Sequence, residues 1–456
     1  MATIRRKPGA YVERVKSAPS IKLDASTSIA GIVGLTLRGV PNKAIRLTSW
    51  AQFENNFGKG YSDVFAQGYV ADAVEGFFLN GGSELYVVRV LGNECAKATA
   101  TIQTANIEAI EEGAWGNDLS VDIAKVSEEY NVTITLQGNV VEEFKGLKAD
   151  DLNKINESEF IRVTGTLAEG SDTLAEGSDG TINSTHYTKA LKAFDIVREI
   201  NQIMIPGVSE LGVQEGLVDY CNSRGRVFPI IDAPVNATYE EVLDFYGKLS
   251  GYRGAIYHPW VQKKDAVTGN LKNIPPSGHV AGLYSRTDNE RGVHKAPAGV
   301  EANLRGIVGV VEELDDATIG SFNANNINCI IPKTGRGIVV WGARLLNEEG
   351  DRKFVSDLRL DDYVETSIES GTEWAVFEPI DEQLFNELEG QLKTFFNTLM
   401  AKGSIKGSTP EEAYYVICDE TINPDPESST VEIEVGYAKK KPAEFVVTRI
   451  SHMRNV

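Results

Sequence analysis

The chain has 456 residues, too many for one compact domain, and this length indicates about two to four domains. Hydrophobic residues make up 42% and charged residues 24%, so the composition is that of an ordinary globular protein with a sizeable core. The formal net charge of −20 opposes binding to phosphate backbones and argues against a nucleic-acid-binding protein. Its simplest interpretation is that it keeps an abundant protein in solution.

Neither the N-terminus nor the cysteines indicate export or a metal cluster. The first 15 residues include basic side chains without an apolar stretch after them, so we expect no signal peptide. No run approaches the ~18 apolar residues that a membrane-spanning helix needs. The four cysteines are widely spaced and form no CxxC pair, which argues against a zinc cluster and a dense disulfide framework.

Residues 1–20 are expected to form an extended N-terminal arm. Pro8-Gly9 and Pro19 bracket a short run with strand propensity. The run consists of Tyr11, Val12, Glu13, Arg14 and Val15. An isolated strand of this length is not stable, so it must pair with another strand.

An α/β domain is predicted for residues 21–92 and 188–334. Its strands are expected at 29–36, 84–91, 203–208, 226–231 and 254–257, and its helices at 50–57, 65–80, 188–201, 213–224 and 239–250. Alternating strands and helices favour a largely parallel sheet covered by helices. Gly31 and Gly34 lie within the first strand and indicate that another element packs closely over it. Residues 262–300 are rich in Pro and Gly and are expected to form loops.

Residues 93–187 are predicted to form an all-β insertion, because their apolar and polar residues alternate. The insertion contains a perfect tandem duplication, in which TLAEGSD occupies 166–172 and again 173–179. Two copies are too few for a solenoid. Their polar composition predicts a surface loop that tolerated a duplication.

Residues 335–456 are predicted to form a C-terminal α+β domain. Strands are expected at 337–341 and 374–377, and a helix at about 360–371. Asp381 caps the longest predicted helix, 381–402, whose apolar stripe has helical spacing. Two further strand patterns follow, at 431–437 and 444–451. The terminal strands either pair within the chain or are donated to neighbouring subunits, and the residues alone favour neither.

No catalytic, cofactor-binding or metal-binding motif is present in the sequence. It lacks HExxH, GxSxG and P-loop motifs, and its glycine-rich segment 335–342 precedes a strand instead of joining a strand to a helix. His258 follows a predicted strand, where α/β enzymes keep their sites, and Asp232 lies at the end of another. An α/β enzyme with a site near His258 and Asp232 is therefore the alternative hypothesis, although a lone histidine of this kind is more often structural.

Several segments, in order, resemble the contractile tail sheath protein family of contractile-tailed phages, phage-tail-like bacteriocins and related injection systems. They include GAYVERV, STSIAGIVGLTLRGVPNKAIRLTSWAQFENNFG, PPSGHVAGLYSRTDNERGVHKAPAGVEANLRGIVGV and GRGIVVWGARLL. The final segment, TPEEAYYVICDETINPDPESSTVEIEVGYAKKKPAEFVVTRISH, extends the resemblance to the C-terminus. Together these segments cover about residues 8–92 and 220–452 and leave out the β insertion.

The resemblance implies a structural subunit that is not an enzyme. Such subunits form six-membered rings or a six-start helix around an inner tube and contract to drive it through a target envelope. Baseplate and tail terminator proteins are the further partners, without nucleic acid and without membrane insertion. The setting would be assembly in a bacterial host cytoplasm, and the product a virion tail or a phage-tail-like particle. A non-contractile shell or adhesin protein would also have terminal strands, but not the ordered family segments.

The resemblance also implies which residues join subunits. The N-terminal arm and a C-terminal strand would pair with the C-terminal domains of neighbours, and the insertion would face outward. The candidate pairing residues are Tyr11, Val12, Glu13, Arg14, Val15, Val431, Ile433, Val435, Phe445, Val446, Val447, Thr448, Arg449 and Ile450. The C-terminal domain would face the tube, with Lys402, Ser404 and Lys406 as candidate contacts.

Overall fold

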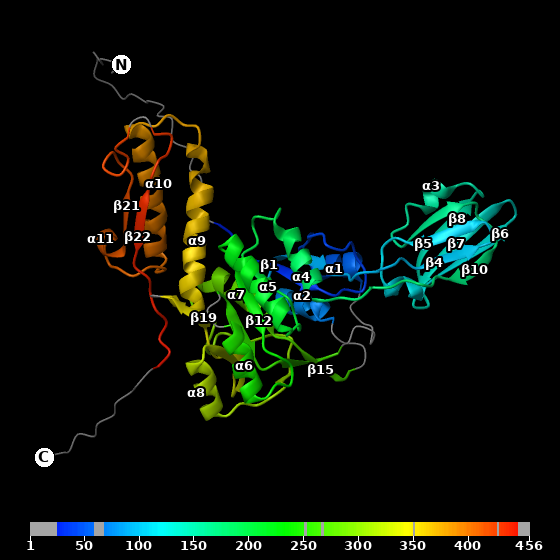
Figure 1. The fold of residues 1–456 in the computed structure, drawn as a ribbon, viewed down its shortest axis with the longest axis horizontal. Helices are drawn as coiled ribbons and strands as arrows, with labels where there is room; N and C mark the ends of the chain where they lie inside the picture. The colour runs from blue at the N-terminus through cyan, green and yellow to red at the C-terminus, as the bar shows by residue number, and fades with distance from the viewer. Residues whose placement is uncertain are drawn as a thin grey trace, which may run out of the picture. The chain divides into compact units, whose positions relative to one another are not determined.

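The structure is a computed structural model that describes residues 25–58, 68–249, 253–265, 269–349, 352–425 and 428–445. The chain divides into two compact units, which Figure 1 shows as a ribbon. The larger unit is built on Ser26–Tyr363 and also takes the tail from Lys441 onward. The smaller unit is built on Val364–Lys440. A mixed α/β multidomain chain is therefore confirmed.

The larger unit is organised around an eight-stranded sheet with the order β18-β17-β13-β12-β11-β1-β3-β2. The six inner strands pair in parallel, whereas the edge strands β2 and β18 pair antiparallel. This arrangement confirms the predicted parallel sheet. The strands are β1 (Ile29–Gly34), β2 (Ile45–Leu47), β3 (Glu84–Arg89), β11 (Gln202–Met204), β12 (Phe228–Asp232), β13 (Ala255–His258), β17 (Ile327–Lys333) and β18 (Gly337–Val340).

Helices cover both faces of this sheet. Successive strand residues point to opposite sides, so the apolar strands present a core to each face. Ile32 and Val87 belong to the core under α1 (Trp50–Phe57), α2 (Val70–Leu79) and α7 (Ser277–Arg291). Val33 and Val88 belong to the opposite core, under α4 (Ser184–Leu191) and α5 (Leu211–Arg224). The second face continues under α6 (Tyr239–Leu249) and α8 (Asp316–Ala324).

Close packing over β1 is confirmed at both of its glycines. A Cβ atom on Gly31 would lie 2.9 Å from the Phe194 ring, and one on Gly34 would lie 2.6 Å from the Val70 side chain. Any larger residue at either position would push a helix away from the sheet. The structure therefore confirms both the predicted strand and the predicted close packing over its two glycines.

The prediction of loops for residues 262–300 is wrong, because α7 is one of the most buried helices. Its residues Ser277–Arg286 are all buried, so this part of the helix has no polar face and no amphipathic pattern. Asp232 anchors its first turn by accepting hydrogen bonds from the Ser277 N–H (2.8 Å) and hydroxyl (2.7 Å). Strands on both sides of α7 in the sequence form a three-stranded sheet. They are β14 (Val261–Lys264) and β15 (Leu271–Ile274) before the helix and β16 (Gly309–Val310) after it.

The insertion is a sandwich of two antiparallel sheets that share one apolar core, drawn in cyan tones in Figure 1. One sheet has the order β10-β6-β7-β8 and the other β4-β5-β9. The elements are β4 (Thr99–Ile102), β5 (Ala105–Ala109), η2 (Ala114–Asp118), β6 (Leu119–Val126), β7 (Glu129–Leu136), β8 (Asn139–Leu147), α3 (Leu152–Ile155), β9 (Ile161–Gly165) and β10 (Gly170–Thr173).

Two details of the insertion differ from prediction. Its C-terminal limit precedes residue 187, because Asn183 caps α4, whose Tyr187 packs in the core of the large sheet. The TLAEGSD duplication is also not a loop. Its first copy leads into strand β10, and its second copy forms bridges from Ala175 to Thr99 and from Ser178 to Ala96. Leu167 and Leu174, at the same place in each copy, are both buried.

The C-terminal domain begins later than residue 335. Strand β18 completes the large sheet, and the boundary between units falls within α9 (Val355–Thr372), after the hairpin of β19 (Arg344–Glu349) and β20 (Arg352–Phe354). The strand predicted at 374–377 is wrong, since a 3-10 turn, η4 (Glu373–Ala375), lies there. The smaller unit continues with α10 (Glu382–Ala401), α11 (Pro410–Ala413), β21 (Tyr414–Ile417) and β22 (Glu434–Tyr437).

Helix α10 confirms the longest predicted helix, 381–402. The Asp381 carboxylate accepts a hydrogen bond from the Leu384 N–H at 2.8 Å and so caps its first turn. The predicted stripe of Leu384, Leu388, Leu392, Phe395 and Leu399 is buried, together with Phe385 and Phe396. In the part of the chain that the structure describes, no helix combines the length and apolarity needed to cross a bilayer.

Candidate inter-subunit surfaces

The smaller unit places a two-stranded antiparallel sheet against α10, as Figure 1 shows for β21 and β22. The Phe396 ring of α10 stacks on Tyr414 of β21 with a centroid distance of 5.2 Å and lies 5.7 Å from Tyr437 of β22. An isolated pair of strands is only marginally stable in water, so this packing holds the sheet together. The sheet is therefore built on one long helix.

Both outer edges of this sheet lack a strand within the described residues, since its order is simply β21-β22. An open edge presents a row of N–H and C=O groups that can accept another strand. Each main-chain hydrogen bond formed there contributes about 0.5–1.5 kcal/mol net. The geometry thus suits strand addition on either side.

The predicted pairing residues of segment 431–437 have different roles. Val435 lies in β22, opposite Val416 of β21. Val431 and Ile433 precede the strand and pack against the cluster of Leu384 and Leu388. Their alternation predicted a strand, whereas the described strand comprises only its last four residues.

The root of the C-terminal arm is attached to its own chain. The Glu444 carboxylate accepts two hydrogen bonds from the Arg344 guanidinium, at 2.8 and 2.7 Å. Arg344 is buried, Glu444 is on the surface, and the pair is bidentate, the stronger type of ion pair. Phe445 follows with 75% of its surface exposed. The other candidate arm residues, 11–15 and 446–450, lie outside the described residues.

The loop after α10 carries exposed lysines. Lys402 and Lys406 are exposed, and the ammonium group of Lys440 donates to the Gly403 carbonyl at 2.7 Å. Ser404 is buried, and its N–H donates to the Leu399 carbonyl, so the prediction that its side chain contacts a tube is wrong. The Schellman-like turn of the chain, with Gly403 at φ +72°, turns this serine inward.

The alternative catalytic pair does not have the geometry of an acid–base site. The Asp232 carboxylate accepts hydrogen bonds from Ser277, at the start of α7, and from the Gly207 N–H. Burial raises its pKa to about 6. Burial also lowers the pKa of His258 to about 4, and its ring packs edge-on against Phe322. Its nearest carboxylate, Glu312, lies 3.5 Å away and is half-exposed. Both residues have structural roles here.

Two features of these surfaces were not predicted from the sequence. Strand β21 was not predicted, although its sequence YYVI has the aromatic and β-branched composition of a strand. The Arg344–Glu444 pair joins residues 100 positions apart, and no local pattern identifies it. No group of three or more metal-ligating side chains occurs among the residues that the structure covers.

Comparison with known proteins shows which proteins the chain resembles. The model of the phage tail sheath protein central domain matches residues 180–344. A protein of Pseudomonas aeruginosa (strain UCBPP-PA14) named as a prophage major tail sheath protein is 29% identical over 207 residues, which are 44% of this chain and 53% of that protein. The central part of the chain is therefore similar to tail sheath proteins. The chain spans about half the length of the curated relatives that it matches.

Other sheath proteins extend the likeness. The tail sheath protein of Escherichia phage P2 is 24% identical over 213 residues, 45% of this chain and 52% of that one. The crystal structure of the sheath tail protein from Desulfitobacterium hafniense has a TM-score of 0.68 at 16% identity and covers 95% of this chain and all of that one. The sheath complex of an extracellular contractile injection system, in its contracted state, has a TM-score of 0.63 at 21% identity, covering 99% and 98% of the chains. The sheath fold therefore extends over nearly the whole chain.

Proposed function

We propose that this chain is a structural subunit of a contractile tail sheath, which polymerises around an inner tube and contracts to drive the tube through a target cell envelope. The observation that carries the proposal is the β21–β22 sheet, a small sheet with both edges open in a chain similar to tail sheath proteins. A subunit of this kind is completed by strands from other copies. No catalytic step is required, because the difference in interface free energy between two assembled states can drive contraction.

In this proposal, neighbouring subunits complete the sheet of the smaller unit. The N-terminal arm (Tyr11–Val15) and the C-terminal arm (Phe445–Ile450) are the proposed donated strands, and β21–β22 is the proposed acceptor. The Arg344–Glu444 ion pair supports this arrangement, because it fixes the point from which the C-terminal arm leaves its own chain. The arms then keep subunits connected while the bodies move during contraction.

Lys402 and Lys406 are proposed to contact the inner tube. Both are exposed on the loop that ends α10, and an ammonium group is attracted to the carboxylates of an acidic partner. The proposed partners are other copies of the chain in six-fold rings or a six-start helix, the tube protein, and the baseplate and terminator proteins. Assembly is proposed to occur in a bacterial host cytoplasm, where the particle is a phage tail or a phage-tail-like device.

Negative-stain electron microscopy of the purified chain at high concentration tests the proposal. We expect hollow, striated tubes wide enough to enclose another tube. A parallel sample should contain an inner tube protein as nucleus, since the sheath can require a template. Discrete small oligomers in both samples, at all concentrations, would contradict the sheath function.

A further inference from the structure

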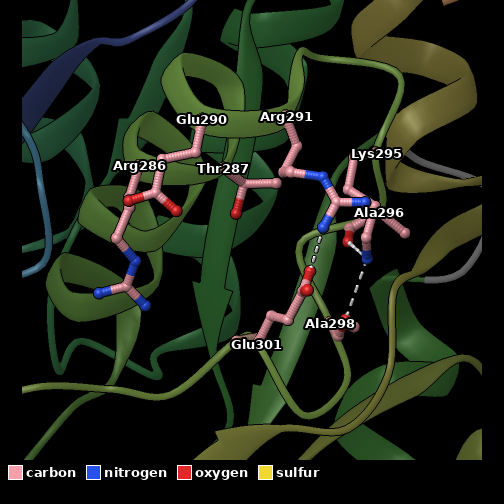
Figure 2. Close-up of a pocket in the computed structure, with 9 residues that line it drawn as sticks. Arg286, Thr287, Glu290, Arg291, Lys295, Ala296, Ala298 and Glu301 are labelled. Carbon is pink, nitrogen blue, oxygen red and sulfur yellow. Dashed lines mark hydrogen bonds and ion pairs between the residues drawn. The ribbon is translucent and has the colours of Figure 1, made fainter. Parts of the chain in front are cut away.

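The larger unit has a basic pocket at the C-terminal end of α7 (Figure 2). Its volume is about 220 Å³, below the ~300–1,000 Å³ typical of small-molecule sites, so it suits one or two protein side chains better than a metabolite. Its residues come from α7 and from the segment that follows it. They are Arg286, Thr287, Glu290, Arg291, Lys295, Ala296, Ala298, Glu301 and Ala302.

The positive charge of this pocket is not fully compensated. Arg291 pairs with Glu301 at 2.5 Å, as the dashed line in Figure 2 shows. The Lys295 ammonium, in contrast, donates only to the Ala296 and Ala298 carbonyls, at 2.9 and 3.4 Å, and no carboxylate among the described residues pairs with it. Burial lowers its pKa, which means that the environment opposes the charged form. A carboxylate entering the pocket would relieve this cost.

Arg286 adds a second unsatisfied cation. It is 7% exposed and donates to Asn303 through Nη2, at 2.5 Å to the carbonyl, while its buried Nη1 has no acceptor among the described residues. Burial is the main cause that lowers the pKa of Arg286. The nearby charge of Arg305 lowers this pKa further, and that of Glu290 raises it. A buried donor of a charged group without an acceptor is costly, because the group has lost its water. The pocket therefore favours an anionic group.

The smaller unit carries an exposed segment with the opposite chemistry. This segment, residues 376–381, will be called the acidic knob. Phe377 is fully exposed (101%), and Val376 and Ile380 are 61% and 41% exposed. Glu378 is exposed as well, and no ion pair involves it among the described residues. Exposed apolar residues gathered at one place mark an interaction site.

The backbone of the acidic knob supports an interaction role. Phe377 has φ +69°, a left-handed conformation that is unfavourable for a bulky residue. Packing against the other described residues does not offset this strain, because the Phe377 side chain is fully exposed. Strained residues of this kind concentrate at functional positions. The position thus orients an aromatic ring and a carboxylate outward together.

We propose that the acidic knob of one copy of this chain docks into the basic pocket of a second copy. The Phe377 ring packs against Ala296, Ala298 and the aliphatic stem of Lys295, where the ammonium also meets the ring face. The Glu378 carboxylate pairs with the Lys295 ammonium. Because a chain of net charge −20 offers few basic pockets, this one is a specific acceptor for another copy's acidic segment.

The contact joins two different surfaces and is therefore heterologous. Repetition of a heterologous contact produces closed rings or open helical filaments. This inference rests on the proposed sheath function, which supplies neighbouring copies, and it names a contact that does not involve the terminal arms. The contact also gives Phe377 the burial that it lacks within its own chain.

Disulfide trapping between two preparations that each carry one introduced cysteine tests the contact. One preparation carries Phe377→Cys and the other Ala298→Cys, both in a Cys95→Ser background, since Cys95 is partly exposed and the other three native cysteines are buried. Neither chain can cross-link within itself at this contact. A matched control replaces Phe377→Cys by Val140→Cys, an apolar residue that is 58% exposed. After mild oxidation we expect about tenfold more mixed covalent dimer than with the control, because docking raises the effective thiol concentration.

Charge exchange provides the second measurement. Lys295→Glu and Glu378→Lys should each reduce polymer yield several-fold, and the double variant should restore it. Tubes in the microscope together with control-level cross-linking and no rescue would overturn the contact while leaving the sheath function standing. Mixed dimers without tubes would support the contact and count against the sheath. Cross-linking within one chain that carries both cysteines, unchanged on dilution, would overturn docking to a second copy.

Discussion

Arg89, at the end of β3, and Asp179, in the second TLAEGSD copy, form an ion pair with a distance of 2.9 Å. The arginine side chain is completely buried, and its Nη1 also donates to the Gly39 and Glu112 carbonyls, both at 2.9 Å. Asp179 additionally accepts from the Ala114 N–H. A residue of the central sheet is thereby tied to two separate segments of the insertion, around Glu112 and around Asp179. These contacts attach the β-sandwich to the α/β domain that it interrupts.

The duplication provides a matched pair of variants for this ion pair. Asp179→Asn should lower the free energy of unfolding by about 3 kcal/mol, because removing one partner leaves a buried charge uncompensated. Asp172→Asn changes the same residue of the first copy, where the carboxylate is exposed, and should change stability by no more than about 0.5 kcal/mol. Urea unfolding followed by circular dichroism measures both. Equal effects of the two substitutions would show that the pair does not stabilise the junction.

Removing the N-terminal arm should separate folding from assembly. A chain lacking residues 1–17 should keep the melting temperature of the intact chain but form no cohesive tubes, because β21–β22 would receive fewer strands. Val447→Pro should have a similar effect, since proline removes a ladder hydrogen bond. Scanning calorimetry and electron microscopy measure the two properties. Normal, contractile tubes from either variant would exclude that segment as a paired strand.

Charge reversal in the loop after α10 tests the proposed tube contact. Lys402→Glu and Lys406→Glu should weaken co-sedimentation with the inner tube by several-fold in low salt. Lys264→Glu, an exposed lysine of the larger unit, is the control and should have no effect. High salt should reduce the difference, because exposed charges are screened over ~10 Å at 0.1 M ionic strength. Unchanged tube binding by both loop variants would place the tube contact elsewhere.

Stability should fall as the pH decreases from about 6.5 to 4. Burial lowers the pKa values of His258 and His279 to about 4, so the unfolded chain binds more protons than the folded chain in this window. Asp232 acts in the opposite sense below about pH 6, because burial raises its pKa and the folded chain keeps a proton that the unfolded chain loses. Two histidines outweigh one aspartate, and the net slope favours higher pH.

Urea unfolding at pH 7, 6 and 5 measures this dependence. His258→Gln should make the slope between pH 6.5 and 5 shallower, whereas Asp232→Asn should make it steeper, although it also removes hydrogen bonds to Ser277. The wild-type loss should be no more than about 3 kcal/mol per histidine, at 1.4 kcal/mol per pKa unit. A stability that does not change between pH 7 and 5 would show that these histidines are not buried in the neutral form.

Phe377→Gly should affect assembly without reducing the stability of the subunit. Glycine accepts the φ of +69° without strain, and the exposed ring contributes little packing, so the free energy of unfolding should change by less than about 1 kcal/mol. Phe385→Ala, in the buried face of α10, should cost about 3–5 kcal/mol by contrast. Thermal melting and turbidity of the polymer report the two effects. A large loss of stability in Phe377→Gly would mean that the ring packs within the subunit.

Local chemistry in the sequence determined much of the architecture. Apolar runs predicted most of the parallel strands, and alternation predicted the β insertion, because burial on two faces or on one imposes these patterns directly. Ser49 and Asp381 marked the starts of α1 and α10, where each side chain accepts a backbone N–H. The resemblance of ordered segments then indicated the sheath family, which the comparison with known proteins supports.

Tertiary structure alone decided the remainder. Residues Ser277–Arg286 of α7 are buried on all sides, so this part of the sequence has no amphipathic period and does not indicate a helix. The two TLAEGSD copies have one sequence, yet only the second reaches Arg89, because partners distant in the chain select which copy forms the ion pair. Residues far apart in sequence also form the ion pair between Arg344 and Glu444. The burial of Ser404 and the basic pocket likewise depend on the folded chain. Short-range patterns record burial and turns, whereas contacts across the fold depend on distances that only the folded chain defines.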